Sequence, residues 1–382
     1  MTQTSDQASE LALPELVDLR TGAWSGSALE RFEWVRALES CPQDPTWHAE
    51  GNVGIHTRMV LDALVEGGDW STLGRTDRWA VFAACLLHDV AKPETTRTEA
   101  DGRISARGHS SRGAIRARRI LWELGVPFEV RELVCRIIAH HQVPFFLIDK
   151  PDAARVAHRI SWQTRCDRLA TVTEADGRGR ECADREDLIA RVELFRELCR
   201  EQGCLSEPRP HPTSNFAAFE YFRHPERDPA YVPHDDSRLE VVLLSGLPAA
   251  GKDTFARSRY AGWPVVSLDA IRAEEGIDPR APQGPVAQRA RERAKQLLRE
   301  ERSFVWSATN LGRRRRAELV DLFTSYRARV HIAYLEASPD ALRARNAARP
   351  EPVPQRAIEK MLDHWEVPTC DEAHQLTVIC GG

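Results

Sequence analysis

The feature that most constrains this chain is an apolar run, LEVVLLS at residues 239–245, that passes directly into the glycine-containing segment GLPAAGKDT. A continuous apolar run of this length is typical of a strand buried on both faces of a parallel sheet. After it, apolar runs alternate with stretches of helical spacing, and this alternation predicts a doubly wound parallel sheet, the α/β fold class. We expect strands at 239–245, 264–269, 303–308, 328–336 and 375–380, and helices at 254–260, 283–300, 313–327, 339–347 and 355–362.

The N-terminal half has a different pattern. From about residue 46 to residue 202, apolar residues recur at helical spacing, and no convincing strand interrupts them. A segment dense in Pro, His, Asp and Arg follows and is expected to be a linker, part of which packs onto a domain through its aromatic residues. The predicted helices span residues 53–66, 78–87, 110–124, 128–140, 153–174 and 185–200. We predict a tail and lead-in segment at 1–45, an all-helical domain at 46–205, a linker at 206–237 and a sheet domain at 238–382.

Composition limits the class of protein. A chain of 382 residues is long for one hydrophobic core, which agrees with two domains. No apolar run is long enough to cross a membrane, and the polar opening residues, expected to be a flexible tail, do not resemble a signal peptide. The nine cysteines are scattered and include no C-x-x-C pair, which argues against a disulfide framework or a zinc ribbon and for a reduced, cytoplasmic location.

Charge gives a local rather than an overall indication of partners. The net charge of −4 does not point to nucleic acid, although arginines are dense at 112–119 and 313–316, where they equally suit a solvated helix face. Only five of the 53 basic residues are lysines, so arginine serves almost everywhere that a plain positive charge suffices. A lysine that persists indicates a need for a compact ammonium group, and Lys92 and Lys252 both lie in the motifs described next.

The segment between the first expected strand of the sheet and its helix has the Gly-x4-Gly-Lys spacing of a P-loop. In that context the loop N–H groups and the helix N-terminus bind phosphates, and Lys252 reaches the β- and γ-phosphates of a nucleoside triphosphate. The next residue is Asp253 instead of the usual Ser or Thr, and its carboxylate is an acceptable partner for Mg²⁺ or one of its waters. The predicted nucleotide-binding residues are Gly246, Leu247, Pro248, Ala249, Ala250, Gly251, Lys252, Asp253 and Thr254.

Residues after the second strand indicate the phosphate acceptor. SLDAIR at 267–272 ends that strand at the edge of the sheet that carries the P-loop. There Asp269 is placed to take a proton from a hydroxyl group that attacks the phosphate. Arg272, about one helical turn further on, suits a 3′-phosphate next to that hydroxyl. A helix cap is the alternative interpretation of Asp269.

Two later segments complete this set. WSATN at 306–310 ends the next strand at the same edge, and RNAARPEPVP at 345–354 is interpreted as a lid, with Arg345 and Arg349 on one helical face. With HWEVP near the C-terminus, the ordered set resembles the polynucleotide 5′-kinase family of bacterial and phage end-healing enzymes over roughly residues 238–382. The resemblance implies that Asp269 is the general base, that Arg272 contacts the acceptor's 3′-phosphate and that both lid arginines bind the donor phosphates.

Histidines and aspartates in the N-terminal half form a second candidate site. LLHDVAKP at 86–93 ends an apolar helix with His88 and Asp89, which are poor core residues but good ligands for a divalent metal. Several histidines with a shared carboxylate describe a site for one or two metals that activates water at a phosphate ester. The further candidates, in chain order, are His56, His109, His140, His141 and Asp167.

With WHAEG, GHSSRGA, IIAHHQ and EADGRGR, these residues resemble the HD-domain phosphohydrolase superfamily over about residues 46–180, and in particular the HD domain of bacterial tRNA nucleotidyltransferases. Adjacent histidines point about 100° apart on a helix, so only one of the His140–His141 pair is expected to bind metal. Asp176 is the alternative to Asp167, and His140 the alternative to His141. The resemblance implies metal ligands at His56, His88, Asp89, His141 and Asp167, with His109 as a ligand or a phosphate contact.

The role of Lys92 follows from the same resemblance, which implies that it holds the substrate phosphate. The alternative is a surface salt bridge, for instance to Glu94. The order of the two modules resembles the bacterial bifunctional HD-domain polynucleotide kinases. Their HD module, with one or two divalent transition-metal ions, would remove a 2′,3′-cyclic phosphate or a 2′- or 3′-phosphate. Their kinase, with ATP or GTP and Mg²⁺, would phosphorylate a 5′-OH of RNA or DNA before a ligase seals the ends.

Two other functions remain open from the sequence. One is an HD nucleotidase fused to a nucleoside or small-molecule kinase, because the size of the acceptor is not written in the motifs. The other is a regulatory protein whose P-loop only senses a nucleoside triphosphate. That second function would not need a general base at Asp269, whereas a kinase would.

Overall fold

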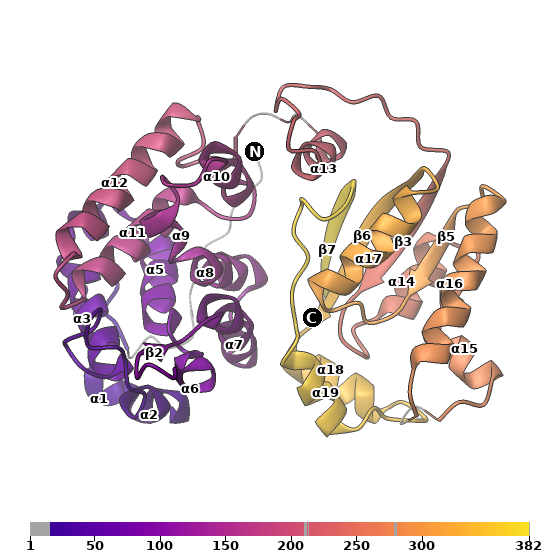
Figure 1. Ribbon diagram of the computed structural model, residues 1–382. Coiled ribbons are helices and arrows are strands. Elements are labelled where there is room, and N and C mark those ends of the chain that lie inside the picture. The colour runs from indigo at the N-terminus through magenta and orange to yellow at the C-terminus, as the bar shows by residue number, and fades with distance from the viewer. Residues whose placement is uncertain (1–15, 210–211, 213, 279–280, 382) are drawn as a thin grey trace. The chain divides into compact units, whose positions relative to one another are not determined.

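In a computed structural model of the protein, described over residues 16–209, 212, 214–278 and 281–381, the chain divides after residue 210 into two units (Figure 1). The predicted flexible tail falls almost wholly within residues 1–15, which lie outside the described residues. Residues 16–45, expected as a lead-in segment, contribute Leu16, Val17 and Leu29 to the core of the first unit. Among the described residues, no helix combines the length and the apolar character needed to cross a bilayer.

The first unit is a helical domain, as predicted. Besides its helices, the described part of this unit contains a short antiparallel hairpin, β1 (Arg97–Thr98) with β2 (Ile104–Ser105), and an isolated antiparallel bridge between Val17 and Trp24. Both are too brief to leave a periodic signal. The prediction of a single helix at 153–174 was wrong, because the structure has two helices separated at residues 162–165. Apolar residues keep the helical spacing across the break, so the sequence pattern does not reveal it. The helices are α1 (Gly26–Leu29), α2 (Glu33–Glu39), α3 (Val53–Glu66), α4 (Gly68–Thr72), α5 (Arg75–Leu87), α6 (Lys92–Thr95), α7 (His109–Glu123), α8 (Phe128–His140), α9 (Val143–Phe146), α10 (Ala153–Ser161), α11 (Cys166–Arg178) and α12 (Arg185–Glu201).

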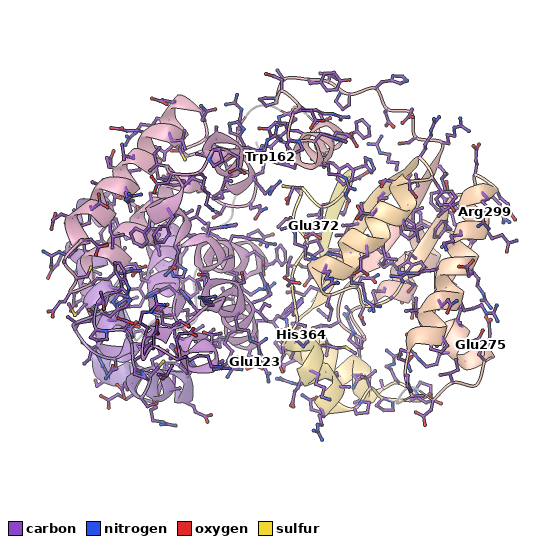
Figure 2. All side chains as sticks on the ribbon, viewed as in Figure 1. Glu123, Trp162, Glu275, Arg299, His364 and Glu372 are labelled. Atoms are coloured by element: carbon purple, nitrogen blue, oxygen red, sulfur yellow. The ribbon has the colours of Figure 1, made fainter. Side chains whose placement is uncertain are left out.

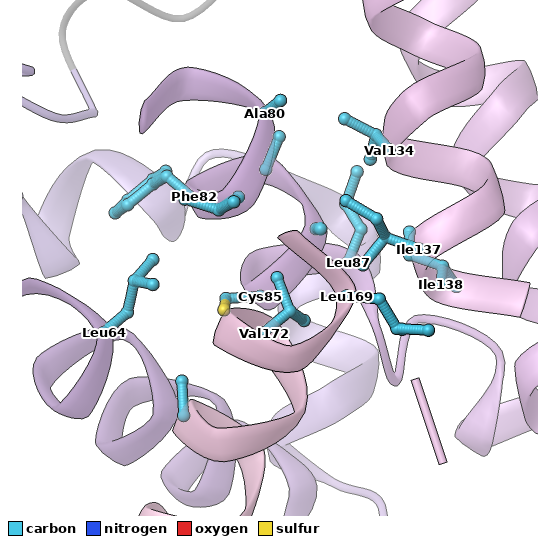
Figure 3. Close-up of a cluster of buried hydrophobic side chains, with 14 of the residues drawn as sticks. Leu64, Ala80, Phe82, Cys85, Leu87, Val134, Ile137, Ile138, Leu169 and Val172 are labelled. Carbon is cyan, nitrogen blue, oxygen red and sulfur yellow. The ribbon is translucent and has the colours of Figure 1, made fainter. Parts of the chain in front are cut away.

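The core of this unit is organised around α5. Every residue from Trp79 to Leu87 is buried, so the helix is covered on all sides, as expected for a helix that is apolar all round. Figure 3 shows the labelled side chains of α5 meeting those of α3, α8 and α11. Because α5 lies inside the domain, the residues that follow its last turn, His88 and Asp89, are delivered to the interior.

The second unit contains the predicted parallel sheet. Its five strands lie in the order β4-β5-β3-β6-β7, and every neighbouring pair is parallel. The strands are β3 (Leu239–Ser245), β4 (Val265–Ser267), β5 (Phe304–Ser307), β6 (Ala328–Ala337) and β7 (Gln375–Gly381). The helices are α13 (Asn215–Arg223), α14 (Lys252–Arg259), α15 (Leu268–Glu274), α16 (Gly284–Arg299), α17 (Arg313–Thr324), α18 (Pro339–Ala347) and α19 (Gln355–Leu362).

Two helices of this unit were not among those expected. Helix α15 starts directly after β4, where the Ser267 hydroxyl accepts a hydrogen bond from the Ala270 N–H and caps its N-terminus. Helix α13 lies within the segment interpreted as a linker. Its Phe219 is buried in the core of the sheet unit, and Phe216 stacks on His374 with ring centroids 5.1 Å apart.

The arginine run at 313–316 is only partly a solvated helix face. Arg314 and Arg315 are exposed, whereas Arg316 has 0% of its surface exposed. Its guanidinium forms two bonds, of 2.7 and 3.0 Å, with the carboxylate of Glu372, which is labelled in Figure 2 in the turn before β7. It also donates to the carbonyl groups of Asn310, Leu311 and Glu366, at 3.0, 2.8 and 2.8 Å.

We expect Arg316→Met to destabilise the sheet unit by about 3–5 kcal/mol, because it leaves a buried carboxylate and three carbonyl groups without their partner. Arg315→Met, an exposed neighbour on the same helix, is the matched control and should change stability by less than about 0.5 kcal/mol. Hydrogen exchange of β3 and β6 amides in the full chain measures this unit separately. Equal amide exchange rates in the two variants would show that the buried hydrogen bonds of Arg316 contribute nothing to the stability of the sheet unit.

Candidate functional sites: a metal centre and a phosphate-binding loop

Four histidines and two aspartates from five helical segments meet inside the first unit, and all six are buried. The Nε2 atom of His56 lies 3.1 Å from Asp176 Oδ1, and that of His109 lies 3.3 Å from His141 Nε2. Asp89 bridges the two groups, with Oδ2 3.2 Å from His88 Nε2 and Oδ1 3.4 Å from His109 Nε2. We call His56, His88, Asp89, His109, His141 and Asp176 the imidazole–carboxylate cluster.

The backbone sets the tautomer of three of these rings. The Nδ1 atoms of His88, His109 and His141 lie 2.7, 2.8 and 2.8 Å from the carbonyl oxygens of Cys85, Ala106 and Ile138, each three residues earlier. Because a carbonyl oxygen can only accept, each Nδ1 carries the proton. Each Nε2 therefore presents a lone pair to the cluster, which is the arrangement that second-shell bonds give to metal-binding histidines.

The charges of the cluster suit a cation. Burial and the neighbouring His109 and His88 lower the pKa of His141 to about 3, so its ring is neutral at pH 7. Although burial favours the protonated acid, the neighbouring His88 and the Lys92 ammonium hold the pKa of Asp89 well below its usual range. The Arg180 guanidinium likewise holds the pKa of Asp176 well below its usual range, against the effect of burial. Neutral imidazoles and ionised carboxylates are the forms that bind metal.

Asp89 gives a direct test of whether a metal fits. Both of its carboxylate oxygens are buried without a hydrogen bond of good geometry among the described groups, although the Lys92 ammonium lies 2.7 Å from Oδ2. A buried carboxylate without such bonds is costly unless a cation completes it. Within the cluster, two groups of three residues each have their potential ligand atoms within 4.8 Å of one another. One group is His56, His88 and Asp176, and the other is Asp89, His109 and His141. The cluster therefore fits one or two divalent ions with a preference for imidazole.

The structure corrects one of the two ligand choices made from the sequence. Asp167 lies outside the cluster, 2.7 Å from Arg165, whereas Asp176 lies within it. The two aspartates are nine residues apart on α11, and at about 100° per residue they lie on opposite faces of the helix. For the histidine pair, His141 joins the cluster, and His140 instead contacts Gln163 at 3.1 Å.

A pocket of about 340 Å³ opens beside the cluster, and His109 and Lys92 form part of its wall. Lys92 is only 6% exposed and contacts Gln43 at 2.6 Å, whereas Glu94 pairs with Arg112. The pocket also contains residues that sequence reasoning missed. They are Arg180, which is paired with Asp176, and two aromatic residues, Trp47 and Phe146, which are 50% and 53% exposed.

In the second unit, the P-loop joins β3 to α14. Gly246 has φ +146°, and a Cβ at this position would lie 2.2 Å from the carbonyl oxygen of Leu335 on β6, so only glycine fits. Gly251, with φ +101°, is the N-cap of α14. Between them Ala249 has φ +63°, a conformation that a residue with a side chain rarely adopts. The loop therefore has the positive φ values and close packing that a phosphate-cradling backbone requires.

Lys252 is the first residue of α14, and its ammonium donates to the carbonyls of Gly246 and Leu247 at 3.0 and 2.8 Å. Desolvation lowers the pKa of Lys252 to about 8. The charges of Asp253 and Asp269 raise this pKa, and the charge of Arg349 lowers it. Asp253 Oδ1 accepts from the Ser307 hydroxyl at 3.4 Å, at the end of β5. This serine was not among the predicted site residues, and it supplies a hydroxyl at the same edge.

The remaining predicted residues of this site lie on α15 and around α18. Asp269 Oδ1 is 2.6 Å from Arg272 Nη1, and the aspartate side chain is 75% exposed. Arg345 is exposed on α18, but the helix ends at Ala347, so Arg349 lies in the following turn and not on the same helical face. The reason is Pro350, which disfavours helix at the residue before it.

The lid segment beyond α18 is fastened by one side chain. The Asn346 amide donates to the Val353 carbonyl at 2.9 Å and accepts from the Val353 N–H at 3.0 Å. This pair of bonds closes the chain from 346 to 353 into a loop, with Arg349 inside it. The segment thus has a defined shape beyond the end of α18 at Ala347, the residue at which the sequence pattern also ends this helix.

Asp176→Asn should weaken binding of Mn²⁺, Co²⁺ or Ni²⁺ by more than the roughly 10–100-fold that follows loss of an outer-shell partner. Asp167→Asn, on the opposite face of the same helix, should bind these ions as the wild type does. Because the cluster is rich in imidazole, Mg²⁺ should bind more weakly than any of the three. Titration calorimetry on chelator-treated protein measures all of these affinities, and loss of affinity in the Asp167 variant alone would contradict the geometry.

Comparison with known proteins agrees with the two units. Residues 53–190 match the HD domain family, and residues 241–368 match an AAA domain family. A Multifunctional CCA protein from Psychromonas ingrahamii is 29% identical over 167 residues, 41% of this chain and 37% of that protein. One from Halorhodospira halophila is 36% identical over 117 residues, 31% of this chain and 26% of that protein. The chain thus spans about a quarter to a third of the length of these curated relatives.

Among solved structures, a sugar kinase from Janibacter sp. HTCC2649 is similar over 37% of this chain and 85% of that chain, with 18% identity and a TM-score of 0.30. The chain thus combines a helical unit similar to HD domains with a five-stranded parallel-sheet unit that carries a P-loop and is similar to AAA domains.

Proposed function

We propose that this chain repairs broken nucleic-acid ends, with a 5′-hydroxyl polynucleotide kinase in its second unit and a metal-dependent phosphoesterase in its first. The observation that carries the proposal is the presence in one chain of two phosphate-directed sites. One is the P-loop after β3, with the Asp269–Arg272 pair after β4, the strand on the other side of β5, and the other is the imidazole–carboxylate cluster beside a basic and aromatic pocket. Breakage of RNA by transesterification leaves the two lesions that such sites would repair.

In the kinase reaction, the oxygen of a 5′-OH forms a bond to the γ-phosphorus of the donor. The bond from that phosphorus to the β–γ bridging oxygen breaks, the nucleoside diphosphate leaves, and the hydroxyl proton passes to the Asp269 carboxylate. Lys252 neutralises the β- and γ-phosphates, assisted by Arg345 and Arg349 from the lid segment. ATP or GTP is the donor. The oxygens of Asp253 and Ser307, which lie 3.4 Å apart, would hold Mg²⁺ or one of its waters, and the ion would neutralise charge on the donor phosphates.

The position of Arg272 supports an acceptor that is a nucleic-acid end. Its Nη1 lies 2.6 Å from Asp269, and its Nε donates to Gln283 at 2.8 Å, so the guanidinium is fixed beside the general base. A guanidinium held there can grip the phosphate that joins the first nucleotide to the second. A free nucleoside has no such phosphate, and a purely nucleotide-sensing protein would need neither residue.

In the phosphoesterase reaction, the six residues of the imidazole–carboxylate cluster would hold one or two divalent ions. When bound, these ions would supply an activated water for attack on a phosphate ester. Lys92, with its ammonium 2.7 Å from Asp89, would bind the non-bridging oxygens of the substrate phosphate at the wall of the pocket. Arg180, fixed by two bonds to Asp176, adds a second positive charge to that wall.

The two exposed aromatic residues of the pocket support a nucleotide as the substrate of this reaction. Trp47 and Phe146 are half exposed and line the same pocket as Lys92 and Arg180. Aromatic side chains stack on nucleobases at about 1–3 kcal/mol per base and do so with little sequence preference. A terminal base against these rings would place its 2′,3′-cyclic, 2′- or 3′-phosphate toward the cluster. The repaired RNA or DNA ends would then suit a ligase, and the setting would be the cytoplasm.

The two activities should be separable in the full chain. Lys252→Ala should abolish transfer of labelled phosphate to a 5′-OH, because it removes the charge that balances the donor phosphates, and it should leave phosphoesterase activity near the wild-type value. Asp89→Ala should have the reverse effect. An oligonucleotide with a 5′-OH and a 2′,3′-cyclic phosphate, supplied with labelled ATP or GTP and divalent metal, reports both reactions. If either change removed both activities from folded protein, the two-site proposal would be wrong.

The kinase should prefer an acceptor with a 3′-phosphate over a free nucleoside. Wild-type protein should phosphorylate an oligonucleotide or a nucleoside 3′-monophosphate far faster than the nucleoside, and Arg272→Ala should reduce this preference by raising the acceptor KM while leaving NTP binding unchanged. Asp269→Ala should lower kcat by roughly 10²–10⁴-fold on every acceptor. Equal turnover of a nucleoside and its 3′-monophosphate by the wild type would instead favour a small-molecule kinase.

A further inference from the structure

Three of the nine cysteines, distant in sequence, meet inside the first unit and away from the imidazole–carboxylate cluster. Cys166 is the first residue of α11, Cys199 lies in the last turn of α12, and Cys204 follows in the next turn. All three are buried, and their sulfur atoms lie within 4.8 Å of one another. Each remains a free thiol.

The spacing of these sulfurs suits a shared metal ion. In a tetrahedral zinc site with Zn–S bonds of about 2.3 Å, neighbouring sulfurs are about 3.8 Å apart, so side-chain adjustments of less than an ångström would bring this triad to that geometry. A disulfide requires a sulfur separation of about 2.05 Å and joins only two of the three. Packing of thiols as small apolar groups would also bury them, but it does not require three to converge on one point.

The turn that carries Cys204 is also held by a buried residue of α10. His158 is 3% exposed, and its Nε2 contacts Gln202 Oε1 at 3.0 Å in the turn between the last two cysteines.

The triad occupies a structural junction. It joins the start of α11 to the end of α12, near the C-terminal end of the first unit. The Cys204 N–H donates to the Cys199 carbonyl at 2.8 Å, and the Asp167 N–H donates to the Leu205 carbonyl at 2.9 Å. The backbone thus already holds the turn that carries Cys204 against α11.

We propose that Cys166, Cys199 and Cys204 supply three thiolate ligands to a structural zinc site that is separate from the imidazole–carboxylate cluster. Three or four thiolates are the usual ligands in two of the ligand sets of structural zinc. Such an ion would fasten the start of α11 to the end of α12, and its role would be stability and not catalysis. The inference does not depend on the proposed function of either unit.

Zinc content and a cobalt spectrum test the proposal on the full chain, purified with reductant and without chelator. Wild-type protein should contain about one more zinc equivalent than Cys204→Ser, as expected for a single closed site. Co²⁺ loaded into the chain should give intense thiolate-to-cobalt charge-transfer absorption in the near ultraviolet, which imidazole and carboxylate ligands do not give. That absorption should disappear in Cys204→Ser and persist in Asp89→Ala, which alters only the imidazole–carboxylate cluster.

Cys135→Ser is the matched control, because Cys135 is equally buried in the same unit but lies outside the triad, and it should keep both the zinc and the cobalt spectrum. If Cys204→Ser fails to fold, the wild-type cobalt spectrum alone decides the question. Absence of thiolate-to-cobalt absorption in folded, reduced wild-type protein would overturn the proposal. So would equal zinc content in the wild type and a folded Cys204→Ser variant, or a disulfide among the three cysteines in protein purified under reducing conditions.

Discussion

The burial of α5 on every side is the constraint on which the first unit depends. A helix whose last nine residues are all covered must lie at the centre of its domain, and the other helices pack around it. The chain leaves this helix at His88 and Asp89, which places a charged residue and an imidazole in the interior. A buried charge is tolerated only with partners, and Asp89 has the Lys92 ammonium 2.7 Å away and the rings of His88 and His109 at 3.2 and 3.4 Å.

In the second unit, the corresponding constraint is the closeness of two parallel strands beneath the P-loop. Gly246 passes so near the Leu335 carbonyl on β6 that no side chain fits, and this fixes where the loop leaves the sheet. Arg316 binds two carbonyl groups of the segment that follows β5, the carbonyl group of Glu366 and the carboxylate of Glu372. Because all five strands are parallel, their carboxyl ends share one edge, and the P-loop, Ser307 and Asp269 all follow strands that end there.

The cysteines and the arginine run show contacts that no one-dimensional pattern indicates. The cysteines are scattered along the chain and include no C-x-x-C pair, yet Cys166, Cys199 and Cys204 come together because α11 packs against α12. Four consecutive arginines suited a solvated face, yet the fourth is buried while its neighbours are exposed. In both cases the deciding contacts join residues far apart in the sequence, and no local spacing encodes them.

Much of the fold followed from local chemistry. Periodic apolar residues predicted the helices around the cluster, the apolar runs predicted the five parallel strands, and the glycine spacing predicted the P-loop, because each depends on residues within one or two turns of one another. The candidate histidines were identifiable as polar residues at the ends of apolar helices. The choice of Asp176 over Asp167, the pairing of Arg180 with it, and the place of Trp47 and Phe146 beside the cluster were decided only by the tertiary structure. Which face of α11 turns inward is set by how that helix packs against α3 and α5, and that packing involves residues more than a hundred positions away.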